Sequence, residues 1–158
     1  MVNVLVTGMS GVGKSSVLKE ISDSDNITVD LDYGDWMYID PSADDFKLDT
    51  NRIVNFIQTT PHKNIFFAGT AINQGEIYPY LDFVITLTAP LEIMKERINK
   101  RTDNSFGKSE YEWEKIVSDK ENFESLIVKS SDLAICTDKP ISDVVKEIYD
   151  FINLSAKA

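Results

Sequence analysis

Residues 8–15 carry glycine, lysine and serine at the spacing that phosphate binding requires. The segment matches G-x-x-x-x-G-K-[ST] in full, and it lies between a predicted strand and a predicted helix. Glycines let the backbone curl so that successive N–H groups point at phosphate oxygens. Lys14 would reach the β- and γ-phosphates, and the Ser15 hydroxyl would take one position around Mg²⁺. We expect the nucleotide to be bound by Gly8, Met9, Ser10, Gly11, Val12, Gly13, Lys14, Ser15 and Ser16.

The sequence lacks the motif that reads guanine in GTP-binding proteins, and this bears on the choice between ATP and GTP. Guanine is usually read by Asn-Lys-x-Asp after a late strand, and the nearest string here, residues 99–102, has Thr where Asp is needed. That string also lies inside a predicted helix. We therefore expect ATP, bound with Mg²⁺, rather than GTP.

Two aspartates, Asp30 and Asp32, close the second predicted strand. Their alternate positions put both carboxylates on one side of an extended chain. Ligands of open parallel sheets sit beyond the carboxyl ends of the strands, so both would lie beside the phosphate loop. We expect Asp30 to hold Mg²⁺ and Asp32 to orient an acceptor hydroxyl or take its proton. The alternative is an aspartate-rich turn.

Further polar residues are candidates for binding that acceptor. Gly69 and Thr70 follow the third strand and would face the same cleft, and the amides of Asn73 and Gln74 could hydrogen-bond an acceptor. A polar turn between strand and helix is the alternative. Arg52, at the start of another predicted helix, could grip an anionic acceptor.

Two arginines precede a polar stretch that suits a mobile lid. Arg97 and Arg101 lie four residues apart on one face of a predicted helix, and a short lid is expected at about residues 102–109. Arginine can stack on adenine and clamp a transferring phosphoryl group, so both are expected at the nucleotide and Arg101 in catalysis. The alternative is a solvated basic face paired with Glu92 and Glu96.

Short apolar strands alternate with helices along the chain. Strands buried on both faces imply a parallel sheet with helices on each side, that is, an α/β domain. The strands are expected at 2–6, 27–31, 65–68, 82–87 and 132–137, and the helices at 14–21, 50–58, 90–101, 109–127 and 142–152. Residues 33–49 are expected to form a long surface excursion, and the tail 153–158 is expected to fray.

Composition limits the partners. The chain has 158 residues, one ordinary domain, with 26 acidic against 16 basic side chains, and this net charge of −10 disfavours nucleic acid and anionic membranes. No apolar run approaches the roughly 20 residues of a membrane span. The single cysteine and the lack of a signal peptide favour the cytoplasm.

Together these residues resemble the small P-loop kinases of the nucleoside monophosphate kinase type, including shikimate kinase and gluconate kinase. The matching features are residues 8–15, the Asp30/Asp32 pair, Gly69 after the third strand, and Arg97 with Arg101 before the polar loop. A closer likeness is to small bacterial ATP-binding proteins often described as AAA-family ATPases or shikimate-kinase-like, at residues 8–11, 68–75 and 104–108.

The resemblance implies a three-layer P-loop NTPase fold with a five-stranded parallel sheet in the order 2-3-1-4-5. It also implies in-line transfer of a γ-phosphoryl group, with positive charge from Lys14, Arg101 and Lys108, and adenine held at residues 137–140. One departure is that the third strand ends Phe-Phe-Ala-Gly, without the acidic residue that nucleotide hydrolases generally need. This favours Asp30 or Asp32 as the group on the metal side.

The leading hypothesis is an ATP-dependent phosphotransferase that acts on a small hydroxyl or phosphate acceptor, either a nucleoside, a nucleotide or a shikimate-like compound. The chain would work as a monomer or weak dimer, with ATP and the acceptor as its partners. The alternatives are a nucleotide-binding switch that signals to a protein, and simple ATP hydrolysis.

Overall fold

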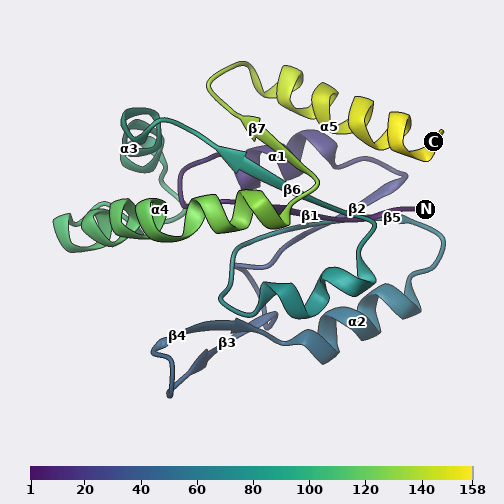
Figure 1. Ribbon diagram of the computed structural model, residues 1–158, viewed down its shortest axis with the longest axis horizontal. Helices are drawn as coiled ribbons and strands as arrows, with labels where there is room; N and C mark the ends of the chain where they lie inside the picture. The colour runs from purple at the N-terminus through teal and green to yellow at the C-terminus, as the bar shows by residue number, and fades with distance from the viewer. Residues whose placement is uncertain (158) are drawn as a thin grey trace.

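A computed structural model describes residues 1–157 of the chain, and in it the expected strands and helices form three layers (Figure 1). The strands are β1 (Asn3–Thr7), β2 (Asn26–Asp30), β3 (Met37–Asp40), β4 (Asp45–Leu48), β5 (Asn64–Ala68), β6 (Phe83–Thr88) and β7 (Leu133–Cys136). The helices are α1 (Lys14–Ile21), α2 (Thr50–Thr59), α3 (Leu91–Lys100), α4 (Glu110–Ser130) and α5 (Ile141–Ala156), with a 3₁₀ helix η1 (Gln74–Tyr80).

Five strands form one parallel sheet in the order β2-β5-β1-β6-β7. Without the two strands of a separate hairpin, this is the expected order 2-3-1-4-5, so the predicted P-loop kinase fold is confirmed. In the register, Val6 of β1 lies between Ala68 of β5 and Ile85 of β6. The carboxyl ends of the central strands therefore meet at one edge, where the phosphate loop begins.

Apolar side chains fill both spaces between the sheet and its helices. Helices α1 and α5 cover one face of the sheet and α2 with η1 covers the other (Figure 1). Val4 and Val6 face the α1–α5 side, whereas the intervening Leu5 faces the α2 side. This alternation is the two-sided burial that a parallel sheet requires, and it fixes β1 as the rigid support of the loop.

The segment predicted as an irregular surface excursion contains an antiparallel hairpin. Strands β3 and β4 pair with Met37 opposite Leu48 and Ile39 opposite Phe46. Leu48 is buried against the sheet, but Tyr38, Ile39 and Phe46 are about half exposed. Aspartates and Pro41 interrupt the apolar alternation in this stretch, which is why the sequence pattern did not predict strands.

Two helix ends differ from the expectation. Helix α5 continues to Ala156, so residues 153–156 of the tail that was expected to fray are helical, and Ala158 lies outside the described residues. Helix α3 ends at Lys100, and Arg101 is the extended residue that follows it. Arg97 and Arg101 are therefore not on one helix, although the Arg101 N–H still donates to the Arg97 carbonyl.

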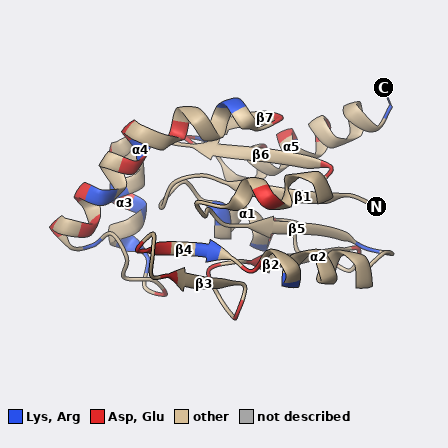
Figure 2. Ribbon diagram, turned by 60° about the horizontal axis from the view of Figure 1, so that its bottom comes forward, with Lys and Arg blue, Asp and Glu red and all other residues tan. Residues whose placement is uncertain are grey.

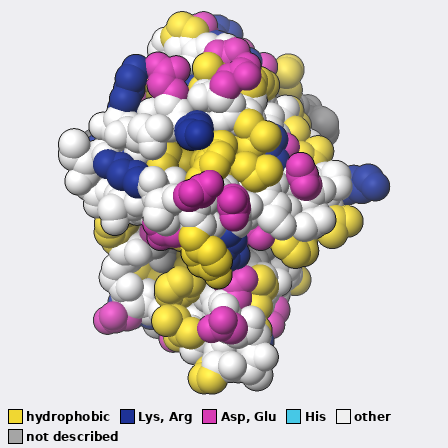
Figure 3. Space-filling view, turned by 90° about the vertical axis from the view of Figure 1, so that its left-hand side faces the viewer, with side chains coloured by type: hydrophobic (Ala, Val, Ile, Leu, Met, Phe, Trp, Pro, Cys, Tyr) yellow, Lys and Arg dark blue, Asp and Glu magenta, His cyan; other side chains and the backbone are white. Residues whose placement is uncertain are grey.

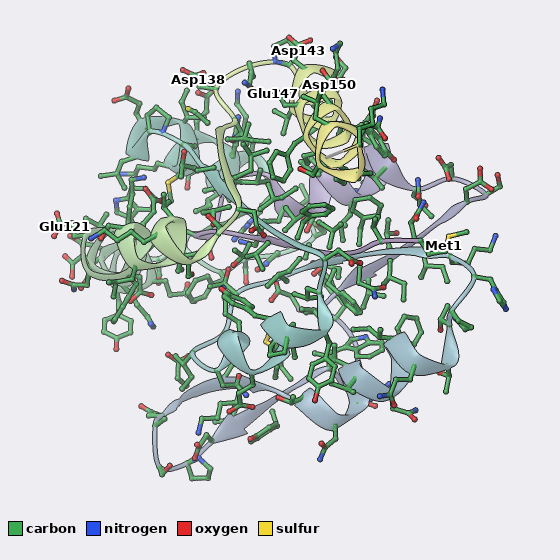
Figure 4. All side chains as sticks on the ribbon, turned by 45° about the vertical axis from the view of Figure 1, so that its right-hand side comes forward. Met1, Glu121, Asp138, Asp143, Glu147 and Asp150 are labelled. Carbon is green, nitrogen blue, oxygen red and sulfur yellow. The ribbon has the colours of Figure 1, made fainter. Side chains whose placement is uncertain are left out.

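Acidic side chains also lie away from the sheet edge that carries the loop. Asp143, Glu147 and Asp150 occupy the outer face of α5, with Asp138 just before that helix (Figure 4). Charges of both signs occupy α3 and α4 at the other end of the molecule (Figure 2). Among residues 1–157 we find no helix that is both long and apolar enough to cross a bilayer.

Candidate active site

The phosphate loop runs from the end of β1 to the start of α1, and two of its glycines are required by space as well as by backbone angle. Gly8 has φ +145°, and a Cβ there would lie 2.4 Å from the Leu87 carbonyl oxygen. Gly11 has φ +87°, and its Cβ would lie 2.9 Å from the Met94 carbonyl oxygen. Any side chain at either position would displace backbone atoms.

The start of α1 presents backbone donors to this loop. The first N–H to bond within the helix belongs to Val17, which donates to the Gly13 carbonyl at 3.0 Å. The N–H groups of Lys14, Ser15 and Ser16 precede it and, in the described part of the chain, have no backbone acceptor. Such N-terminal amides, together with the helix dipole, attract phosphate.

Lys14 folds back over the loop. Its Nζ donates to the carbonyl oxygens of Gly8 at 2.6 Å and Met9 at 2.9 Å. Burial lowers the pKa of Lys14 to about 8, against the opposing attraction of Asp32 and Asp30. The ammonium is thus held by weak acceptors at a place where a phosphate would bind it more strongly.

Ser15 and Asp30 are in direct contact. Ser15 Oγ donates to Asp30 Oδ2 at 2.7 Å, and Asp30 Oδ1 accepts the Asp32 N–H at 3.1 Å. A hydroxyl and a carboxylate oxygen are hard donors of the kind that Mg²⁺ binds alongside phosphate and water. In residues 1–157 no group of three or more metal-ligating side chains gathers. Binding of Mg²⁺ by Ser15 and Asp30 stays a prediction.

Asp32 faces the same space from the end of β2. The pKa of Asp32 is raised above the usual aspartate value, mainly by burial and also by the nearby Asp30 carboxylate. The positive charges of Lys14 and Arg101 oppose this shift. These influences place Asp32 within electrostatic reach of both Lys14 and Arg101. A carboxylate with a raised pKa is a better proton acceptor than an ordinary one.

Thr70, which follows β5, is tied to the entrance of the phosphate loop. Its Oγ1 donates to the Gly8 carbonyl at 2.6 Å and accepts the Gly8 N–H at 3.1 Å. It also lies 3.0 Å from the hydroxyl of Thr7, which in turn donates to Gln74 Oε1 at 3.2 Å. Sequence reasoning missed Thr7, a fully buried residue; the only signal was a hydroxyl at the end of an apolar strand.

The amides of Asn73 and Gln74 are bonded within the protein. Asn73 accepts from the Leu48 N–H at 2.7 Å and donates to the Leu48 carbonyl at 3.1 Å, which fixes the end of β4. Gln74 is buried and also donates to the Tyr78 hydroxyl at 2.8 Å. Gly69 packs so closely on Leu31 that a Cβ would lie 2.9 Å from it. Contact of these residues with an acceptor remains a prediction.

Arg97 links α3 to the phosphate loop and to the end of β7. Nη1 donates to the Val12 carbonyl at 3.2 Å and to Thr137 Oγ1 at 2.8 Å, and Nη2 donates to the Thr137 carbonyl at 2.6 Å. The Thr137 hydroxyl donates to the Val12 carbonyl at 2.6 Å. The guanidinium therefore holds the loop beside the segment where the resemblance expects adenine.

Arg101 is held by the lid segment, residues 102–109. Its Nε donates to the Asn104 carbonyl at 3.1 Å and its Nη2 to the Phe106 carbonyl, while Lys108 Nζ donates to the Arg101 carbonyl. Gly107 has φ +92° and packs against Ile116 of α4. A groove of about 380 Å³ lies behind this segment, between α3 and α4, and of the predicted site residues only Lys108 lines it.

Arg52 lies in the first turn of α2 and contacts the residues just before β3. Its guanidinium stacks 4.6 Å from the centre of the Trp36 ring. Nη1 also donates to the Asp35 carbonyl at 2.9 Å and lies 3.6 Å from the Asp35 carboxylate. The structure thus brings Lys14, Ser15, Asp30 and Asp32 together and gives Arg52 partners of its own.

Comparisons with known proteins agree with this architecture. The model of a family of AAA domains matches residues 4–129. No curated protein sequence matches the chain significantly. The similar solved structures include a shikimate kinase from Acinetobacter baumannii in complex with shikimate, with 17% identity and a TM-score of 0.71 over 99% of this chain and 95% of that one.

Two other kinases have the same fold. A deoxyadenosine kinase from M. mycoides with bound dATP is 16% identical, with a TM-score of 0.63 over 97% of this chain and 100% of its own. A sugar kinase from Janibacter sp. HTCC2649 is 13% identical, with a TM-score of 0.67 over 97% and 95% of the two chains. At such identities the likeness establishes the fold.

Proposed function

The chain belongs to the AAA domain family, and we propose that it is an ATP-dependent phosphotransferase that moves the γ-phosphoryl group of Mg-ATP to a small acceptor. The observation that carries this proposal is the contact between the start of α1 and the end of β2. The Ser15 hydroxyl lies 2.7 Å from the Asp30 carboxylate. The backbone N–H of Asp32 donates to the same carboxylate. This arrangement supports a metal-binding role for Asp30 and an acceptor-binding role for Asp32.

The chain supplies the groups that the donor nucleotide needs. The amides at the start of α1 and the Lys14 ammonium would bind the phosphates, and Arg97 positions the loop beside Thr137. Ser15 and Asp30 would hold Mg²⁺, which when bound neutralises part of the charge of the transferring group. Arg101, directly before the lid segment, and Lys108, within it, would add positive charge when the lid closes.

Asp32 is the residue we assign to the acceptor hydroxyl. It would accept the hydroxyl proton while the acceptor oxygen bonds to the γ-phosphorus and the bond from that phosphorus to the bridging oxygen of ADP breaks. Its raised pKa supports this role, because the proton would be taken more readily than by an ordinary aspartate.

Transfer is favoured over hydrolysis by the residues at the end of β5. That strand ends at Ala68 and is followed by Gly69, so no acidic side chain stands beside the loop at this position, and Thr70 bonds to Gly8. The carboxylates lie instead at the end of the edge strand β2, which points to an acceptor bound on that side.

The test is ADP release in a coupled assay with Mg-ATP and a panel of nucleosides, nucleotides, sugar acids and shikimate. At least one acceptor should raise turnover well above slow hydrolysis, and the Lys14→Ala variant should fold but show no transfer. Tight nucleotide binding without stimulation by any acceptor would contradict the proposal and favour a nucleotide-binding switch.

A further inference from the structure

Two side chains donate to the Gly8 carbonyl oxygen, which belongs to a buried residue at the entrance of the phosphate loop. Lys14 Nζ and Thr70 Oγ1 each lie 2.6 Å from this oxygen. A carbonyl oxygen has two lone pairs, so these two donors fill its capacity as an acceptor. Lys14 begins α1, whereas Thr70 follows β5, so two separate parts of the fold share one backbone acceptor.

The bond from Lys14 to Gly8 competes with nucleotide binding. An ammonium binds a charged phosphate oxygen more strongly than a neutral carbonyl, so a bound nucleotide draws Lys14 Nζ away from Gly8. The described surface at the end toward which the strands point mixes hydrophobic, acidic and basic side chains rather than forming one basic patch (Figure 3), so the phosphates depend on cleft cations such as Lys14. When Lys14 moves, the Gly8 carbonyl keeps the bond from Thr70. A buried carbonyl without a donor costs free energy, which would oppose binding.

The Thr70 hydroxyl has no capacity left for a further ligand. It donates its one proton to the Gly8 carbonyl, and its oxygen accepts the Gly8 N–H at 3.1 Å. The Thr7 hydroxyl, 3.0 Å away, is then the donor to the remaining lone pair of Thr70, and it shares its proton with Gln74 Oε1 at 3.2 Å. Thr70 is therefore bonded to the loop backbone and to buried polar groups rather than free to bind an acceptor.

A second buried threonine lies on the neighbouring strand and provides a contrast. Thr86 of β6 is the register partner of Thr7, and both are fully buried. Their neighbours Leu5 and Val84 pack in one cluster, so Thr7 and Thr86 share that face of the sheet. In residues 1–157 the Thr86 hydroxyl has no hydrogen-bond partner. Burial of a hydroxyl at this place is thus not enough to connect it to the loop, and the bonds of Thr70 and Thr7 are specific.

From this geometry, and resting on the nucleotide binding that the proposed function includes, we propose that Thr70 is a positioning residue of the phosphate loop and not a contact of the acceptor. Thr70 keeps the Gly8 carbonyl bonded while Lys14 moves from that carbonyl to the nucleotide phosphates. It acts through Gly8 and Lys14 and touches neither the nucleotide nor the acceptor. The contributions of Thr70 and Lys14 are therefore coupled, with opposite sign in the free protein and in nucleotide binding.

The first experiment tests the shared carbonyl without nucleotide. In Thr70→Val the Gly8 carbonyl keeps Lys14, and in Lys14→Met it keeps Thr70, but the double variant leaves it neither donor. The Gly8 N–H loses its acceptor whenever Thr70 becomes valine, so that loss cancels in the comparison. We expect Thr70→Val to lower the urea midpoint about twice as far in the Lys14→Met background as in the unmodified protein. A double variant that does not fold, beside single variants that do, is the same result at its extreme, and an equal shift in both backgrounds overturns the proposal.

The second experiment measures the coupling in nucleotide binding by calorimetry at millimolar Mg-ATP. Thr70→Val should raise the Kd about tenfold when Lys14 is present and by less than about threefold in Lys14→Met, because no ammonium leaves the carbonyl there. Thr70→Ser should keep the Kd of the unmodified protein. Thr86→Val, which removes a buried hydroxyl that has no partner, should keep it too. A role of Thr70 in folding alone gives the same factor in both backgrounds, and that result overturns the proposal.

Steady-state kinetics separate this inference from the proposed kinase function. With an acceptor that supports ADP release, Thr70→Val should raise KM for ATP and leave KM for the acceptor unchanged at saturating ATP. A rise in the acceptor KM alone would make Thr70 an acceptor contact, which overturns the inference and leaves the kinase function standing. If no acceptor supports turnover, the kinase function is overturned, and the unfolding and binding cycles still decide the role of Thr70.

Discussion

Ser15 Oγ and Asp30 Oδ2 lie 2.7 Å apart, although β1, which leads into α1, and β2, which ends at Asp30, are not neighbours in the sheet. Strand β5 lies between β2 and β1 and ends at Ala68, and Gly69, which follows it, packs closely against Leu31. The carboxylate that would face the metal thus reaches the loop from the edge strand rather than from the strand beside β1.

The contact predicts a specific change in magnesium dependence for Asp30→Asn. An amide keeps the shape but removes the negative charge, so the Mg²⁺ concentration for half-maximal activity should rise about tenfold or more. A magnesium titration of ADP release at saturating ATP measures it. Asp143→Asn, on the outer face of α5, is the control and should behave as the unmodified protein (Figure 4). An unchanged midpoint in Asp30→Asn would remove Asp30 from the metal site.

Asp32→Asn should separate chemistry from nucleotide binding. Loss of the proton acceptor should lower kcat with the best acceptor by about a hundredfold or more. The Kd for ATP, measured by calorimetry, should change little, because the phosphates are bound by the loop and Lys14. A larger loss of ATP affinity than of kcat would place Asp32 on the nucleotide side instead.

ATP binding should take up protons near pH 8. The pKa of Lys14 in the free protein is about 8 because burial lowers it, and a bound triphosphate raises it by attraction. The complex then holds more protons than its free components, so ATP affinity should fall as the pH rises through about 8. Calorimetry in buffers of different ionisation enthalpy measures the uptake. The uptake should vanish in Lys14→Met, and its persistence there would assign it to another group.

Most of the architecture could be predicted because it rests on local patterns. The run Val4-Leu5-Val6 before Gly8 predicts a buried strand that leads into a turn, and the structure confirms both. The β3–β4 hairpin could not be predicted in this way. Its apolar residues Tyr38, Ile39 and Phe46 stay exposed, so burial, the force behind the period-two pattern, does not select them.

The site was predictable to the extent that strand ends determine it. Asp30 and Ser15 meet because each directly ends or begins an element at the same sheet edge. The stacking of Arg52 on Trp36 depends on a loop path that no local pattern encodes. The same holds for the bonds of Thr7 to Thr70 and Gln74, which join residues more than sixty positions apart.

Thr70→Val should disturb the phosphate loop, whereas Thr70→Ser should not. The valine has nearly the shape of threonine but neither donates to the Gly8 carbonyl nor accepts the Gly8 N–H, so the N–H loses its acceptor and the carbonyl keeps the bond from Lys14 Nζ. We expect a weaker ATP Kd, by about tenfold, and a free energy of unfolding lower by about 1–2 kcal/mol. Calorimetry and urea unfolding check both. An unaffected Kd in Thr70→Val would show that the loop holds its shape without this residue.

Arg97→Ala should weaken both the fold and nucleotide binding. The guanidinium joins Val12 to Thr137 through bonds of 2.6–3.2 Å, and its planar fork reaches the Thr137 carbonyl and hydroxyl together. Removing it leaves partly buried acceptors without a charged donor, at a cost of about 2–3 kcal/mol in unfolding free energy. Urea unfolding measures this loss, and Lys100→Ala on the same helix is the control because Lys100 pairs with the exposed Glu96.

Arg97→Lys should not restore stability, since an ammonium cannot span the two Thr137 oxygens and the Val12 carbonyl. Full recovery in the lysine variant would show that positive charge alone is needed there, and ATP affinity should then recover with it.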